Sequence, residues 1–184
     1  MALPIRACII DWETLSTLPT AKVIAVGLTA FDLTVESTID ELRATTESFN
    51  IDSGSQSDRH ICPDTFEWWT KQSDEAKAAL LDNQLNIKEA LSRIISFIEN
   101  HKIQYLVGNG STFDNAILAD LCREHGIDYP VEYWQDMVLR TMKLLAGMNG
   151  KAKFPEGLTK HIAADDAIYE AMVAQTCWRR TRSG

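Results

Sequence analysis

The sequence predicts an α/β fold, in which helices flank a mixed β-sheet within one domain. Apolar, β-branched runs come first, helical spacing replaces them after about residue 60, and a further strand then alternates with helices. Strands first and helices alternating with strands later are typical of a mixed sheet covered by helices. The chain has 184 residues, a usual length for one domain, and no stretch resembles a linker. We therefore expect residues 1–184 to form a single domain.

The first third of the chain predicts strands. Residues 5–10, IRACII, are apolar on both faces, as in a central strand. Residues 22–31, KVIAVGLTAF, repeat the pattern, and the short segment before them predicts an antiparallel pair. Residues 34–49 alternate weakly and are interpreted as a third strand. Residues 50–60 are a polar loop.

The remainder predicts mainly helices. Residues 64–81 indicate one or two helices with Ser73 as an N-cap, and residues 87–100 carry apolar side chains at helical spacing. Residues 103–107 predict a buried strand. The other expected elements are a helix over 113–125 ending at Gly126, a helix over 136–146, a glycine-rich loop over 147–157 and a last helix over 164–180.

Composition excludes several classes of protein. The chain is 45% hydrophobic and 24% charged, as in globular proteins. No apolar run approaches the roughly 20 residues of a membrane span, and the first residues lack the pattern of a secretory signal. The four cysteines form no CxxC pair, so we expect reduced thiols and no zinc site. We expect a cytoplasmic protein that does not associate with membranes.

The charge is unevenly distributed. The net charge of −8 argues against a protein that coats nucleic acid generally. Residues 140–184, however, hold eight Lys and Arg against four Asp and Glu. An acidic body with a basic C-terminal region could still present a phosphate-binding face.

The first candidate site is Asp11 and Glu13, directly after the first strand. Side chains two apart on an extended chain point the same way, so both carboxylates project together. Two hard oxygen ligands could hold Mg²⁺ or Mn²⁺. Taken alone, the triplet also fits an ordinary polar strand end.

The second candidate is Asp114, which opens the helix expected over 113–125. Asp is common in a first turn because it complements the helix dipole. Yet Asp114 begins the same helical stripe as Ile117, Leu118 and Leu121, which faces inward. A buried carboxylate needs a partner, and a metal ion would serve.

The third candidate pairs His161 with an acid of the last helix. Residues five apart do not share a helical face, so we expect His161 in the loop and Asp166 in the first turns. A loop histidine can act as a general base. Asp165, four residues from His161, is an alternative to Asp166 on spacing alone.

Together these signals resemble the DnaQ-like 3′–5′ exonuclease superfamily, in its histidine-containing DEDD branch. The resemblance covers residue 9 to about 178, and its H-x-A-x-x-D-A element matches at His161, Ala163, Asp166 and Ala167, which favours Asp166 over Asp165. It implies a ribonuclease H-like sheet. A narrower resemblance, to phage and prophage 3′–5′ exonucleases and related bacterial exoribonucleases, rests on Thr65, Trp68, Trp69, Gln72 and Ser73.

Two details of the narrower resemblance stay open. The adjacent tryptophans fit a core residue and a face for stacking a nucleobase equally well. Relatives carry an acid a few positions before an Arg-Thr pair, whereas here Asp136 is displaced from Arg140 and Thr141. The resemblance therefore assigns no role at the site to Asp136.

The resemblance implies a metal-dependent 3′–5′ exonuclease that releases nucleoside 5′-monophosphates from single-stranded DNA or RNA. Two Mg²⁺ or Mn²⁺ ions would be held by Asp11, Glu13, Asp114 and Asp166, with His161 as the base. Several such enzymes are dimers, so a homodimer is one state to test. A non-catalytic nucleic-acid-binding module on the same fold is the alternative. The expected nucleic-acid contacts are Thr14, Leu15, Trp69, Lys151 and Lys160.

Overall fold

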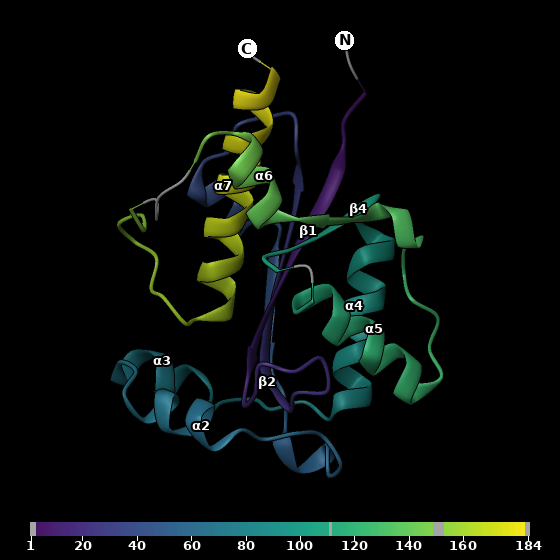
Figure 1. The fold of residues 1–184 in the computed structure, drawn as a ribbon, viewed down its shortest axis with the longest axis vertical. Helices are drawn as coiled ribbons and strands as arrows, with labels where there is room; N and C mark the ends of the chain where they lie inside the picture. Colours follow the sequence, from purple (N-terminus) through teal and green to yellow (C-terminus); the bar gives the residue numbers. More distant parts are fainter. Residues whose placement is uncertain (1–2, 111, 149–152, 183–184) are drawn as a thin grey trace.

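One mixed sheet forms the centre of the molecule, with helices on both faces (Figure 1). The computed structural model describes residues 3–110, 112–148 and 153–182. Within them, five strands pair in the order β3-β2-β1-β4-β5. The strands are β1 (Arg6–Thr14), β2 (Val23–Asp32), β3 (Thr46–Asn50), β4 (Tyr105–Gly108) and β5 (Asp136–Val138). The β1, β2 and β3 strands are antiparallel to one another, whereas β4 runs parallel to β1 and β5 parallel to β4.

The helices divide between the two faces of the sheet and one end of it. Figure 1 shows α4 and α5 on one side, α6 and α7 on the other, and α2 and α3 beyond the end of the β1–β2 pair. The helices are α1 (Ile39–Arg43), α2 (Pro63–Thr70), α3 (Asp74–Ala79), α4 (Ile87–Asn100), α5 (Asp114–His125), α6 (Leu139–Leu145) and α7 (Ala163–Arg182). Short 3₁₀ turns cover Ser53–Ser55 and Tyr133–Gln135.

Strand β1 separates two hydrophobic cores because its successive side chains alternate between faces. Cys8, Ile10 and Trp12 pack into the core beneath α4 and α5. Ala7 and Ile9 pack into the core beneath α7. The predicted central strand is therefore confirmed, and Asp11 and Glu13 continue the face that meets α7.

Most predicted elements are confirmed. The two expected N-terminal strands are antiparallel, and Ser73 caps α3 by accepting from the Ala76 N–H at 3.2 Å. Gly126 ends α5 in the left-handed conformation, with φ of 65°. Cys8, Cys122 and Cys177 are buried free thiols, and Cys62 is a half-buried one.

Two predicted boundaries are wrong. Residues 34–49 hold helix α1 as well as the start of β3, since Thr38 and Glu41 form a capping box. Residues 136–138, expected in a helix, form strand β5 beside β4. The predicted loop over 147–157 lies partly outside the described residues.

No helix in the described parts of the chain is both long and apolar enough to cross a bilayer.

Candidate active site

The end of β1 carries the first two acidic side chains. The β1–β2 ladder shifts register between Glu13 and Thr14, so the regular pairing is interrupted directly after the second carboxylate. Glu13 is 8% exposed and Asp11 is half-buried. Both carboxylates lie on the face of the sheet that α7 covers.

Gly27 lets α7 approach these carboxylates closely. It pairs with Asp11 across the β1–β2 ladder and so shares the face of Asp11. A Cβ at Gly27 would lie 1.9 Å from the carbonyl oxygen of Ala163, the first residue of α7. The start of α7, with Asp166 in its first turn, therefore rests directly on the sheet beside β1.

Asp114 is held at the start of α5 by backbone amides. Its carboxylate accepts from Asn109 N–H at 2.8 Å and from Trp12 N–H at 3.4 Å. The Trp12 indole also donates to the Asp114 carbonyl at 3.1 Å. Asp114 is only 1% exposed, so it faces inward as predicted. Burial raises its pKa, and these amides partly offset the rise.

His161 lies in the loop before α7, in the place that the sequence predicts. Its backbone adopts φ of 64°, in the left-handed region, and its N–H donates to the Asp166 carboxylate at 2.5 Å. The imidazole meets the Trp68 ring edge-on, with centroids 4.8 Å apart. Asp166 therefore stabilises the loop conformation that presents the imidazole, while Trp68 restricts the ring.

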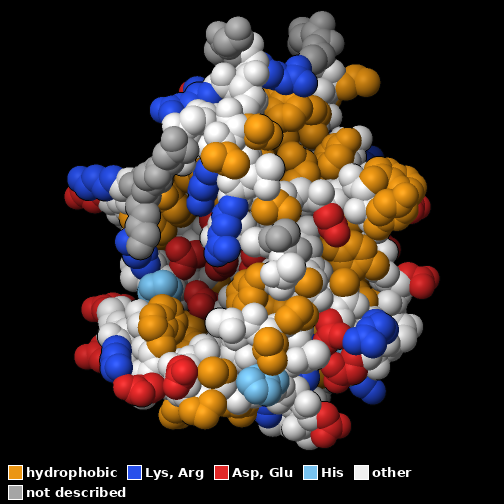
Figure 2. Space-filling view, viewed as in Figure 1, with side chains coloured by type: hydrophobic (Ala, Val, Ile, Leu, Met, Phe, Trp, Pro, Cys, Tyr) orange, Lys and Arg blue, Asp and Glu red, His pale blue; other side chains and the backbone are white. Residues whose placement is uncertain are grey.

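Three of the predicted residues converge on a metal-sized space. Single ligand atoms of Glu13, His161 and Asp166 lie within 4.8 Å of one another. Figure 2 shows acidic side chains gathered in a hollow of the surface, with a histidine at its edge and Lys or Arg side chains beside it.

The acids of this hollow repel one another. Burial, Asp166 and Asp114 raise the pKa of Glu13 to about 8. Burial chiefly raises the pKa of Asp166 to about 6. Burial, followed by the neighbouring carboxylates, raises the pKa of Asp11 well above its usual range. A divalent cation would relieve this repulsion, and carboxylate oxygens are the ligands that Mg²⁺ and Mn²⁺ prefer. The residues present therefore fit such an ion.

An apolar hollow of about 420 Å³ adjoins the acids. Trp68, Trp69 and Phe113 line it together with Glu13 and Thr14. The two tryptophans differ in exposure: Trp69 is 6% exposed and donates to the Thr14 carbonyl at 2.8 Å, whereas Trp68 is 41% exposed. One tryptophan therefore packs in the interior, and the other presents most of the exposed aromatic surface.

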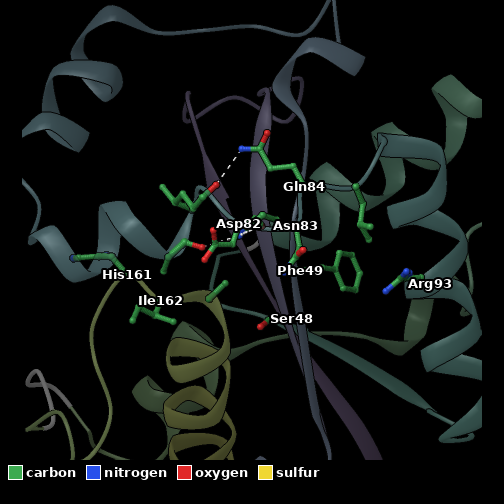
Figure 3. Close-up of a pocket in the computed structure, with 14 residues that line it drawn as sticks. Ser48, Phe49, Asp82, Asn83, Gln84, Arg93, His161 and Ile162 are labelled. Atoms are coloured by element: carbon green, nitrogen blue, oxygen red, sulfur yellow. Dashed lines mark hydrogen bonds between the residues drawn. The ribbon is translucent and has the colours of Figure 1, made fainter.

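A second hollow, of about 690 Å³, extends from His161 along the edge strand β3 (Figure 3). Ser48, Asn83, Gln84 and Arg93 contribute to its polar wall. His161 lines this second hollow and contacts Trp68, which lines the apolar one.

The other residues expected to contact nucleic acid lie in different surroundings. Thr14 lines the apolar hollow, but Leu15 is absent from the described lining residues and uses its backbone to bond Lys22 and Cys62. Lys160 is exposed beside His161, with its ammonium 5.6 Å from the Phe154 ring centroid. Lys151 lies outside the described residues.

The Asp136 carboxylate forms hydrogen bonds with α5 and with the loop after it. It accepts from the Asn115 amide at 2.9 Å and from the Tyr129 hydroxyl at 2.8 Å. It joins β5 to α5 and to the loop that follows α5.

Sequence reasoning missed two residues of this region, Phe113 and Glu170. Phe113 is the N-cap of α5, and no motif or spacing in the sequence indicates that it lies at the site. Glu170 is 5% exposed and follows Asp166 by four positions. Helical spacing alone could have placed Glu170 on the face of Asp166.

The sequence matches the family described as 3′-5′ exoribonuclease Rv2179c-like domain over residues 6–178. The chain belongs to this Rv2179c-like family. The predicted DnaQ-like superfamily is thereby confirmed, and the protein is a 3′–5′ exonuclease. It is 28% identical over 187 residues to an exodeoxyribonuclease of Enterobacteria phage T4, covering 88% of this chain and 82% of the phage protein.

Solved structures share the fold of this exonuclease. The nuclease domain of 3′hExo, a DEDDh family member bound to rAMP, matches with a TM-score of 0.54 at 15% identity, over 94% of this chain and 90% of that one. Product-bound exonuclease I matches at 0.56 and 16% identity, over 98% of this chain and 44% of that one. The Mg²⁺- and Mn²⁺-bound form of S. pombe Pop2p matches at 0.56 and 15% identity, over 91% and 80%. These matches confirm the predicted ribonuclease H-like fold.

Proposed function

We propose that this exonuclease uses two divalent ions to remove nucleoside 5′-monophosphates from the 3′ end of single-stranded DNA or RNA. The observation that carries the proposal is the convergence of Glu13, His161 and Asp166 within 4.8 Å, beside an aromatic hollow. Acid groups and a histidine lie where an ion and a terminal nucleotide could be held together.

The four predicted acids would hold the ions. Asp11 and Glu13 lie on β1 and Asp166 lies in the first turn of α7, while Asp114 begins α5 and accepts from the Asn109 N–H just after β4. Bound ions would neutralise the scissile phosphate and lower the pKa of the attacking water. The protein itself would position the general base, since the Asp166 carboxylate also accepts from the His161 N–H and so supports the loop that carries His161.

His161 would take the proton of the attacking water. Burial, and then Lys160, lower the pKa of His161 below its ordinary 6.5. The imidazole is therefore mainly neutral at pH 7 and able to accept a proton. Its edge-on contact with Trp68 limits the directions in which the ring can turn.

The aromatic hollow would hold the terminal nucleoside. Its volume of about 420 Å³ lies within the range of small-ligand sites. Trp68 and Phe113 supply faces against which a base can stack, and Glu13 at the wall would keep the sugar–phosphate near the ions. Thr14 would contact the same nucleotide.

The strand upstream would leave past His161. Lys160 is exposed there and could contact a phosphate; Lys151, the other lysine expected to contact the strand, lies outside the described residues. The hollow along β3 offers amide and hydroxyl side chains, with Arg93 at its far end. Apolar side chains such as Phe49, Leu80 and Ile162 line the same hollow, so it could contact bases as well as the backbone of the strand.

The preference between DNA and RNA is open to a direct test, because the family is described by exoribonuclease activity and the phage relative is an exodeoxyribonuclease. Two 5′-labelled single strands of one sequence, one DNA and one RNA, would be incubated with Mn²⁺, with Mg²⁺ and with EDTA. We expect a metal-dependent ladder that shortens from the 3′ end and is absent in Asp11→Ala.

The faster substrate in that assay identifies the preferred sugar. If neither strand shortens with any metal while both still bind, the non-catalytic binding module replaces the proposal. If a nucleoside monophosphate, tested beside the two strands, is the only substrate hydrolysed, the protein is instead a small-molecule phosphatase.

A further inference from the structure

Glu170 is a buried carboxylate that the proposed mechanism leaves unused. It lies on α7 one turn after Asp166 and is 5% exposed. Residues four apart in a helix share one face and lie about 6 Å apart along the axis. Because Asp166 faces the sheet, Glu170 faces it as well, one turn further along α7.

The direction of α7 brings Glu170 toward Asp11. Figure 1 shows α7 running back toward the end of the sheet at which β1 begins. A step from Asp166 to Glu170 on the helix therefore corresponds to a step from Glu13 to Asp11 on the strand. Consistent with this placement, Glu170 raises the pKa of Asp11 more than any other neighbouring acid does.

One oxygen of Glu170 has no protein partner. Its Oε2 atom is buried and accepts no hydrogen bond from any described residue. Lys143 and Arg140 of α6 lie near enough to lower the pKa of Glu170, yet within the described chain neither forms an ion pair with it. A buried, unpaired carboxylate oxygen is costly, which points to a cationic ligand that completes the site.

We propose that Glu170 is a fifth carboxylate of the metal centre, acting beside Asp11 to hold a divalent ion directly or through one water. This inference rests on the proposed two-ion function and extends it. Glu170 thereby adds a negative charge on the side of the centre that Asp11 and Asp114 share. Its effect on the reaction comes through the ion, so it is a positioning residue.

The test is a titration of the intact, metal-free protein with Mn²⁺. Electron paramagnetic resonance of the free ion measures how much Mn²⁺ remains unbound. Glu170→Gln keeps the shape of the side chain and removes its charge. We expect an affinity for Mn²⁺ about 10- to 100-fold weaker than that of the wild type, the loss typical when a group supporting metal ligands is removed. Glu156→Gln, the same change at an exposed position before α7, should bind as the wild type does.

A second measurement separates metal binding from a purely structural role. If Glu170 only anchors α6 through Lys143, Glu170→Gln should lower the melting temperature of the metal-free protein and leave Mn²⁺ affinity unchanged, which would overturn the inference. Under the inference, the metal-free melting temperature does not fall, and the increase produced by Mn²⁺ becomes smaller.

The outcomes also distinguish this inference from the function on which it rests. If the wild type itself binds no Mn²⁺, both fail. If the wild type binds Mn²⁺ and Glu170→Gln binds it equally well, only the assignment of Glu170 fails.

Discussion

At the scale of single residues, the position of the His161 imidazole is set by contacts with neighbouring residues. A left-handed backbone, a bond from its N–H to Asp166 and an edge contact with Trp68 together set the position of the imidazole. Non-glycine residues rarely occupy that backbone region, so the conformation is held by these contacts.

His161→Asn should abolish most of the activity while preserving the fold. We expect kcat to fall about 100- to 10,000-fold, since the variant lacks a general base. Because the pKa of His161 is lowered, the wild type should keep its activity down to a pH below 6.5, where protonation of the imidazole begins. Single-turnover rates against pH would check both points. Comparable rates in the variant and the wild type would remove His161 from the mechanism.

The adjacent tryptophans should respond in opposite ways to truncation. Trp68→Ala removes a half-exposed ring, so we expect a loss of about 1–3 kcal/mol in oligonucleotide binding with little change in stability. Trp69→Ala opens the interior and removes the bond to Thr14, so unfolding should become easier by about 3–5 kcal/mol.

Fluorescence anisotropy would measure binding by these variants, and urea titration their stability. Trp68→Phe is the control, since it retains a ring for stacking. If Trp69→Ala weakens oligonucleotide binding and Trp68→Ala does not, the stacking surface belongs to Trp69 and the prediction is wrong.

At the scale of secondary-structure elements, the contact of α7 with the sheet assembles the site. Helix α7 brings Asp166 and Glu170 to β1, and the loop before it brings His161. Gly27 permits this contact because any side chain there would occupy the position of the Ala163 carbonyl.

Gly27→Ala should therefore displace the start of α7. We expect a loss of about 1–3 kcal/mol in unfolding free energy, as is usual for overpacking, together with weaker Mn²⁺ binding. Gly110→Ala is a matched control near the same site, because its Cβ would meet its nearest neighbours at 3.7 Å. If Gly27→Ala and Gly110→Ala bind Mn²⁺ with equal affinity, the close contact of α7 at Gly27 is not needed for metal binding.

The elements that sequence pattern failed to predict are the short ones. Strand β5 has three residues, too few to show a period, and exists because β4 offers it an edge to pair with. Helix α1 has five residues and is marked by a capping box within a weakly alternating segment. Long amphipathic helices such as α4 were predicted at their full length, because periodicity accumulates with length.

At the scale of the whole molecule, the acidic hollow makes folding sensitive to pH and to metal. Glu13 and Glu170 have pKa values raised to about 8 and Asp166 to about 6, above their ordinary 4.5 and 3.8. Between the ordinary and raised values the folded protein binds more protons than the unfolded chain. The free energy of unfolding therefore falls as the pH rises through this interval.

The metal-free protein should accordingly melt at a lower temperature at pH 8 than at pH 5. We expect a difference of at least about 2–4 °C, the effect of about 1 kcal/mol in a domain of this size. Mn²⁺ should remove the difference, and Glu13→Gln should reduce it. Differential scanning calorimetry with and without EDTA would measure it. A metal-free protein that became more stable toward pH 8 would contradict the account of the hollow.

Local pattern was sufficient for strands β1, β2 and β4 and for the long helices, because periodicity and caps lie within short stretches of chain. It also singled out Asp11, Glu13, Asp114 and His161 as candidates, whereas the family resemblance was needed to favour Asp166 over Asp165. Local pattern was insufficient wherever the outcome depends on segments far apart. Which tryptophan is buried depends on a bond to Thr14, and the surroundings of Glu170 depend on how α7 lies against β1. Such contacts join residues more than 50 positions apart in the sequence, so only the packed molecule decides them.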